Sequence, residues 1–205
     1  MYSKKDFTEI LASLRGTLKT DTGDALCCKL HECGNAPGAV EIEYADGSTD
    51  LHVAEACNVA AVIESLDRIL SLPRSTVACQ ELSEVMLLRL DVVREYVRSL
   101  LPEADYQEAD AEALIRWWAG FLKHPGGFVL AHRCFGDVSM IEGALRLDKD
   151  AITTFGQMGS HDKKDRVKKS YENLPVEVVL PTILEIDEFF KACRNHIEKA
   201  LNIYV

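Results

Sequence analysis

The feature that most limits the fold is a long segment, residues 76 to 101, in which apolar residues recur at helical spacing. It follows Ser75 and ends before Pro102, because proline cannot continue a helix. The main apolar stripe consists of Leu82, Val85, Met86, Val93, Tyr96, Val97 and Leu100. A second set of apolar residues widens the stripe until little of the surface is polar: Leu87, Leu88, Leu90 and Val92. Such a helix is central in its domain, or it keeps a second face for a partner.

Four further segments repeat apolar residues at helical spacing and predict helices. The first covers residues 4 to 19 and opens with a capping box at Ser3-Lys4-Lys5-Asp6. In the second, Asp50 can cap a helix that breaks at Leu72-Pro73. The last covers residues 182 to 201, where a narrow apolar seam is suited to packing along one neighbouring helix.

The remaining helical segment carries both tryptophans of the chain. Asp105-Tyr106-Gln107-Glu108 offers a capping-box pattern for its start, and Pro125 stops it. Its wide apolar face consists of Trp117, Trp118, Phe121 and Leu122. So much aromatic area on one face predicts a helix that packs on the core.

Two short runs alternate apolar and polar residues and predict a β-hairpin at 24–46. The runs are ALCCKLHE and AVEIEYA, and they are joined by the turn residues 33–38. Asp46-Gly47 closes the second run. Together the segments predict a mainly α fold, a helical bundle-like domain of about five helices with a small N-terminal β-hairpin. We expect residues 1–205 to form a single domain with this hairpin as a small appendage.

The formal net charge of −10 disfavours broad phosphate binding, because an acidic surface repels a nucleic acid. The segment 148–174 is polar and predicts a mobile loop. It contains five basic residues that suggest a contact with nucleic acid or with an acidic partner: Lys163, Lys164, Arg166, Lys168 and Lys169. The alternative is a solvated loop. We also expect a cytoplasmic protein without membrane contact, because the sequence shows no signal peptide and no membrane-spanning run.

The seven cysteines include a group that invites a zinc interpretation: Cys27, Cys28 and Cys33, with His31 between them. Structural zinc sites usually pair their ligands at two separate knuckles, and no second Cys-x-x-Cys exists here. We therefore favour buried thiols on a strand and predict neither a metal nor another cofactor. The odd number and irregular spacing of the cysteines also argue against a disulfide framework.

Four residues near the aromatic helix are candidates for catalysis: Arg116, His124, His132 and Arg133. Histidine could move protons in the cleavage of a phosphodiester while arginine holds the charged oxygens. In the structural alternative, His124 caps the C-terminal end of its helix and Arg133 pairs with a surface acid.

The pairing of arginine with histidine in a small helical protein is similar to that of the HEPN superfamily. Its ribonucleases carry an arginine, four to six residues and then a histidine. Here seven residues separate Arg116 from His124, and Arg194 and His196 are separated by only one. The resemblance covers helical class and residue type only, and through these it implies a ribonuclease that needs no metal.

Two functions are therefore expected from the sequence. The favoured one is a cytosolic, non-catalytic interaction or regulatory protein that acts through helix-mediated self-association or through partner binding. The alternative is a metal-independent phosphodiester enzyme of the ribonuclease type that uses the four candidate His and Arg side chains. The sequence leaves open whether the protein is an enzyme.

Overall fold

The structure, a computed structural model, describes residues 2–19, 26, 29–30, 36–72, 76–123, 146–148 and 177–205. The first part of the chain forms α1 (Lys4–Ser13), the π-helical turn η1 (Leu14–Leu18), and the strands β1 (Ala39–Glu43) and β2 (Thr49–Val53). Three helices follow: α3 (Ala54–Ser71), α4 (Thr76–Ser99) and α5 (Asp110–Lys123). The last elements are β3 (Arg146–Asp148), β4 (Glu177–Val179) and α9 (Ile183–Tyr204).

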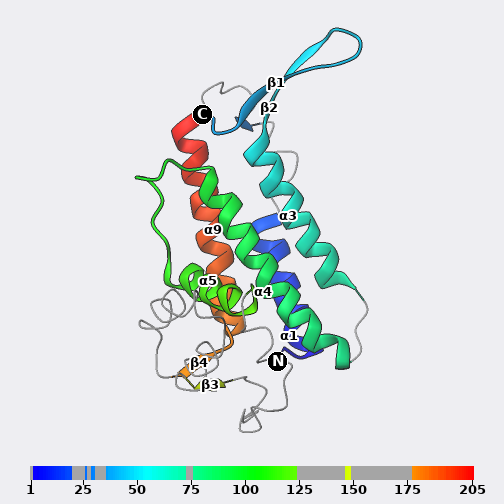
Figure 1. The fold of residues 1–205 in the computed structure, drawn as a ribbon, viewed down its shortest axis with the longest axis vertical. Coiled ribbons are helices and arrows are strands. Elements are labelled where there is room, and N and C mark those ends of the chain that lie inside the picture. Colours follow the sequence, from blue (N-terminus) through cyan, green and yellow to red (C-terminus); the bar gives the residue numbers. More distant parts are fainter. Residues whose placement is uncertain are drawn as a thin grey trace, which may run out of the picture.

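Helices α1, α3, α4 and α9 run along the long axis of the molecule, and α5 crosses the bundle near one end (Figure 1). α3 packs against α4, α5 lies on α4 and α9, and α1 with η1 packs on α3 and α9. Strands β1 and β2 form a ribbon that projects from the other end of the bundle, where the C-terminus also lies (Figure 1). The mainly α fold with a small N-terminal hairpin is therefore confirmed.

The first and last helices both begin with capping boxes. The Ser3 side chain accepts the Asp6 N–H at 3.2 Å, and the Asp6 carboxylate accepts the Ser3 N–H at 2.6 Å, as predicted. At the start of α9, Thr182 Oγ1 accepts the Glu185 N–H at 3.2 Å, and the Glu185 carboxylate accepts the Thr182 N–H at 2.7 Å. Each box satisfies two N–H groups that would otherwise lack a partner, so both helix starts are defined locally.

The core lies between α1, α3, α4, α5 and α9, and it uses the apolar stripes expected from the sequence. From α4 it includes Met86, Leu87, Leu90, Val93 and Val97, and Leu100 follows directly after this helix. From α9 it includes Ile186, Phe189, Phe190, Cys193, Ile197 and Ala200. Each large apolar side chain that is fully buried contributes about 1.5–3 kcal/mol relative to an exposed one. The stripes of both helices are therefore used within the chain, although Val85 of α4 remains 41% exposed.

The position predicted for the hairpin, 24–46, is wrong. β1 pairs instead with β2 in antiparallel register, with Ala39 opposite Val53 and Glu43 opposite Thr49. The turn lies between the strands, where the Gly47 N–H donates to the Tyr44 carbonyl at 2.9 Å. Gly47 has a φ of +80°, which a residue with a side chain rarely adopts. Asp46-Gly47 thus joins two strands instead of closing the second one, and residues 29–30 are helical.

Two predicted helix starts also differ from the structure. Asp50 lies in β2, and α3 begins at Ala54 without a side-chain cap. α5 begins at Asp110, and the carboxylate of Glu112 accepts the Ala109 N–H at 2.9 Å. Aspartate side chains suit strand ends and turns as well as caps, so a cap pattern does not by itself locate a helix start.

In the second half of the chain, the short strand β4 pairs with β3 in antiparallel register. Residues 149–174 of the predicted mobile loop lie outside the described residues.

Candidate functional site

Of the four residues predicted to be catalytic, Arg116 lies on α5 and is described. Its Nε and Nη2 donate to the two carboxylate oxygens of Glu108 at 2.8 and 2.9 Å. This bidentate pair raises the pKa of Arg116 and engages its guanidinium within the protein. The other three candidates, His124, His132 and Arg133, lie outside the described residues. Their convergence with Arg116 therefore stays a prediction.

The basic segment and the cysteine group also fall outside the described part of the chain. These residues are Lys163, Lys164, Arg166, Lys168, Lys169, Cys27, Cys28, His31 and Cys33. Within the part that is described, no group of three or more His, Cys, Asp or Glu side chains is arranged to hold a metal ion. Cys193 is a free thiol in the core, where burial raises its pKa, so it is unreactive there.

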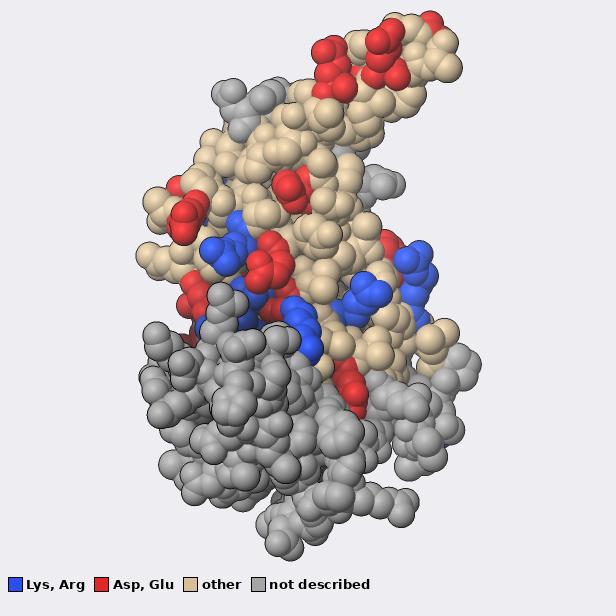
Figure 2. All heavy atoms as spheres, viewed as in Figure 1, with Lys and Arg blue, Asp and Glu red and all other residues tan. Residues whose placement is uncertain are grey.

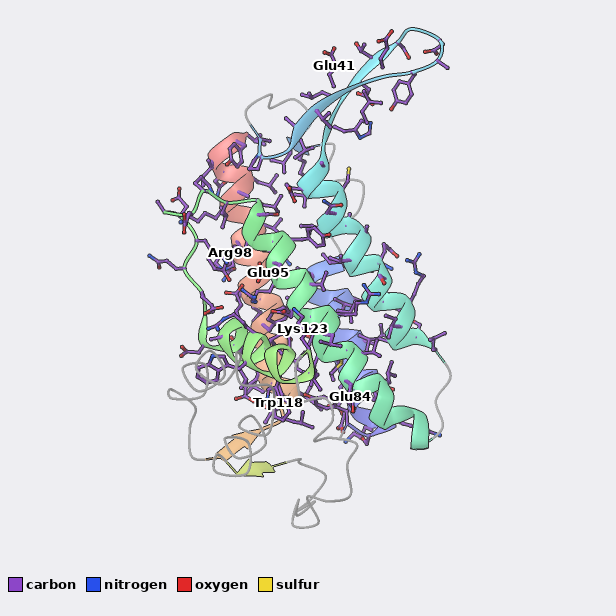
Figure 3. The ribbon with its side chains drawn as sticks, viewed as in Figure 1. Glu41, Glu84, Glu95, Arg98, Trp118 and Lys123 are labelled. Atoms are coloured by element: carbon purple, nitrogen blue, oxygen red, sulfur yellow. The ribbon has the colours of Figure 1, made fainter. Side chains whose placement is uncertain are left out.

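A row of charged side chains joins α4 to α5. Arg94 donates from Nε and Nη2 to Asp91 Oδ1 at 3.0 and 2.9 Å, and Lys123 donates to Asp91 Oδ2 at 2.5 Å. Glu108 extends the row, since it lies 3.5 Å from Arg94 Nη1 and also binds Arg116. Lys123 lies at the end of α5 that meets α4 (Figure 3). Arg94 is only 2% exposed, and the more exposed Arg116 and Lys123 are paired with Glu108 and Asp91, so this row holds α5 in place.

Burial lowers the pKa of Arg94, but its hydrogen bond to Asp91 and the charges of Asp91 and Glu95 together raise the pKa by more than burial lowers it. The pKa of Arg94 therefore lies above its ordinary value. Arg94 consequently stays charged in the folded protein, as its ion pairs require.

A second polar cluster ties the start of α5 to α9. Glu112 is fully buried, and its carboxylate accepts the Tyr106 hydroxyl at 3.2 Å and the Ala109 N–H at 2.9 Å. His196 Nε2 lies 3.0 Å from the same carboxylate, and the His196 ring packs against the Tyr106 ring with centroids 4.9 Å apart. Burial raises the pKa of Tyr106, which keeps its hydroxyl protonated as a donor. A buried carboxylate with three partners is satisfied within the protein, so its main effect is on packing.

A hollow of about 450 Å³ lies between the start of α5 and α9. It is lined by Ala109, Asp110, Ala111, Leu114, Glu185, Glu188, Lys191, Ala192 and Asn195. Lys191 donates to Glu188 at 2.8 Å, and Glu185 belongs to the capping box of α9. These charged groups are therefore engaged within the protein, and the described residues that line the hollow include no pairing of nucleophile and base.

The hairpin, by contrast, exposes apolar side chains. Val40 is 45% exposed, Ile42 38% and Tyr44 44%. These residues alternate along β1 and at its end, so they lie on one face of the ribbon, where His52 is opposite Val40 and Asp50 is opposite Ile42. We call the three residues Val40, Ile42 and Tyr44 the apolar face of the hairpin. Large contiguous apolar patches on a protein surface often mark an interaction site, and these neighbouring side chains form such a patch on the ribbon.

The opposite face of the ribbon is acidic. Glu41 and Glu43 alternate with the apolar residues, and Glu41 extends from the ribbon away from the bundle (Figure 3). Residues 39–53 contain four acidic residues, Glu41, Glu43, Asp46 and Asp50, and neither lysine nor arginine. Figure 2 shows acidic side chains on the projecting end of the molecule. The hairpin thus combines an apolar face with a negative potential.

This surface was missed in the sequence because the partner strand of β1 was expected to precede β1 in the chain, whereas the partner, β2, follows it. A signal was available, since Asp-Gly between two alternating runs is a strong local indication of a hairpin. The runs AVEIE and TDLHV flank Tyr44-Ala45-Asp46-Gly47-Ser48. Exposure itself had no sequence signal, because alternation marks two faces without showing which of them is covered.

The sequence matches no protein-family model, and comparisons with curated proteins and with solved structures find no match. Among the described residues, no helix combines the length and the apolar character that crossing a membrane requires.

Proposed function

We propose that this protein is a non-catalytic interaction protein that binds a protein partner through the β1–β2 hairpin. The observation that carries the proposal is the exposure of Val40, Ile42 and Tyr44 on a ribbon that projects from the bundle (Figure 1). An isolated two-stranded hairpin is marginally stable in water, so contact with a partner would also stabilise this one. The proposal keeps the interaction role expected from the sequence and moves it from the helices to the hairpin.

The helices offer less support for such a role. The exposed large apolar residues on α9 are Leu184, which is 68% exposed, and Ile203, which is 42% exposed. They lie near opposite ends of α9, about 28 Å apart at the helical rise of about 1.5 Å per residue. Self-association through helices, the other form of the original expectation, therefore remains a competing proposal. Sedimentation of the purified protein would test it directly.

We propose a cytoplasmic setting for this interaction. The free thiol of Cys193 supports it, because reducing compartments keep thiols in this form.

The proposed function can be tested by photo-crosslinking in the cell that makes the protein. A photoreactive side chain replaces Ile42 in one variant and Leu184 in another, and adducts are identified by mass spectrometry. Both positions are exposed and apolar, so the second is a matched control. We expect a discrete protein adduct from position 42 that is absent from position 184. The same adducts from both positions, or none from position 42, would contradict the proposal.

The alternative, a metal-independent phosphodiester enzyme, retains its own test. It depends on His124, His132 and Arg133, together with Arg116, whose guanidinium binds Glu108. If it holds, the purified protein cleaves RNA in the presence of a chelator, and His132→Ala abolishes cleavage with little change in melting temperature. We expect no cleavage by either protein.

A further inference from the structure

The backbone of β1 has hydrogen-bonding groups that its partner strand does not use. The Tyr44 N–H donates to the Ser48 carbonyl at 2.8 Å, and the Ala54 N–H donates to the Gly38 carbonyl at 3.0 Å. Hydrogen-bonded pairs alternate along an antiparallel ladder, so the even-numbered residues of β1 face β2. The N–H and C=O groups of Glu41 and Glu43 consequently point away from β2, whereas the N–H of Ala39 already donates to the Ala36 carbonyl at 3.1 Å.

No other described strand pairs with this outer edge of β1, since the sheet has only the two strands β1 and β2. β1 is also the more exposed of the two, because every residue from Val40 to Glu43 is exposed, whereas β2 ends in the fully buried Val53. The edge has no proline, no lysine and no bulge, which are three of the means by which proteins prevent strand addition. An extended segment can therefore reach it.

We infer that the outer edge of β1 accepts an extended segment of a partner protein in which basic and apolar residues alternate. This inference rests on the proposed function and specifies the chemistry of the partner. A strand added to β1 alternates its side chains between the two faces of the ribbon. On one face its apolar residues lie beside Val40, Ile42 and Tyr44, and on the other its lysines or arginines lie beside Glu41 and Glu43.

Charge decides between this partner and other occupants of the same edge. A second copy of β1 would bring the Glu41 and Glu43 carboxylates against those of its twin, and like charges across strands are destabilising. A nucleic acid or an anionic membrane would meet the carboxylates of Glu41, Glu43, Asp46 and Asp50 and be repelled. A basic segment, by contrast, gains from both the carboxylates and the apolar face, and it provides partners for the open backbone groups of β1.

The first test uses a labelled synthetic peptide of alternating valine and lysine and measures its binding to the full chain by fluorescence anisotropy. Two peptides serve as controls, one with the same composition in separate blocks and one with glutamate in place of lysine. We expect the alternating peptide to bind best and its affinity to fall as salt is added. Equal binding of all three peptides, or a preference for the glutamate peptide, would overturn the inference.

Paired variants locate the site. Reversing both charges with Glu41→Lys and Glu43→Lys should weaken binding about tenfold or more, whereas Glu103→Lys, on an exposed residue outside the hairpin, should change it little. Ile42→Ser should weaken binding similarly, with Leu184→Ser as the apolar control. All these side chains are exposed, so the melting temperature of each variant should stay near that of the parent and rule out unfolding. A control that weakens binding as much as its counterpart would show that the peptide does not occupy β1.

The mode of binding has its own readout. The peptide should slow hydrogen exchange at the amides of Glu41 and Glu43, which face the open edge, more than at Val40 and Ile42. Protection of other amides instead would show that the peptide does not add to the edge of β1. A dimer seen by sedimentation that Ile42→Ser dissociates would show that a second copy of the chain, and not a different protein, occupies this edge.

The two proposals can fail separately. If position 42 gives a specific adduct but the alternating peptide neither binds nor competes with that adduct, the hairpin still binds a partner and the inferred chemistry is wrong. If position 42 gives no specific adduct, the proposed function itself fails.

Discussion

Asp67 of α3 connects the N-terminal helix to the rest of the bundle, so Asp67→Asn tests how much this connection stabilises the fold. Arg15 donates from Nε and Nη2 to the two carboxylate oxygens at 2.7 and 2.9 Å, and Lys19 Nζ lies 3.2 Å from the carboxylate. The Asp67 side chain is 7% exposed. The substitution to asparagine keeps the shape of the side chain and removes its charge.

The size of the effect follows from the pKa of this carboxyl. The hydrogen bonds from Arg15, with those from Lys19 and the charges of both, lower the pKa of Asp67 from 3.8 to about 2, although desolvation opposes the change. At about 1.4 kcal/mol per pKa unit, this difference corresponds to about 2 kcal/mol. Arg15 is 52% exposed, so solvent screens the pair, and we expect about 1–2 kcal/mol of lost stability for Asp67→Asn at neutral pH. For a chain of this size the melting temperature should fall by about 2–8 °C.

The lowered pKa also fixes the direction in which the stabilisation by Asp67 changes with pH. Because the pKa of Asp67 is lower in the folded protein, its contribution is complete above the unfolded pKa of 3.8 and is lost as the pH falls through about 2. The difference in unfolding free energy between parent and variant should therefore be constant near neutral pH and shrink between about pH 5 and pH 2. Urea denaturation at several pH values measures this difference.

A control and a double-mutant cycle complete the test. Glu9→Gln removes the partner of Lys5 in a pair with an N–O distance of 3.6 Å and side chains 46% and 85% exposed, and it should cost about 0.5 kcal/mol or less. Asp67→Asn should cost clearly more, and its effect should become smaller in an Arg15→Gln background. Equal effects of Glu9→Gln and Asp67→Asn, or a difference that persists unchanged to pH 2, would refute the assignment.

Four further substitutions test packing and backbone conformation, and urea denaturation measures each. Trp118 is fully buried on α5, so Trp118→Ala should cost about 3–5 kcal/mol, and an unchanged midpoint would place this side chain at the surface. Gly38 has a φ of +72°, and an added Cβ would lie 3.0 Å from Glu55 Cγ, so Gly38→Ala should cost about 1–2 kcal/mol. Gly47 has a φ of +80°, but a Cβ added there would have no atom within 4 Å, so Gly47→Ala should cost less. Glu112→Gln turns one acceptor of a buried carboxylate into a donor and should cost about 1–3 kcal/mol, whereas no loss would mean that the contact with His196 is unimportant.

The helices could be predicted from the sequence because their signals are local. Apolar spacing depends on residues three or four positions apart, and the box at Ser3 depends on a partner three residues away. The buried stripes of α4 and α9 followed from the same spacing, as did the burial of Trp118. The alternation of apolar and acidic residues along β1, which belongs to the candidate site, could also be predicted, because it repeats every second residue.

Strand pairing was harder to predict, because alternating runs on either side of β1 offered it two possible partners. The turn at Asp46-Gly47 selected the later one, β2.

What the tertiary structure alone decided is which groups meet and which surfaces stay open. Arg15 reaches Asp67 across 52 positions of the chain, and His196 reaches Glu112 across 84, so no local pattern could reveal either pair. The exposure of Val40, Ile42 and Tyr44 has the same origin. An apolar residue on a strand is buried only where another element covers it, and the packing of the helices leaves this face of the hairpin projecting beyond the core (Figure 1).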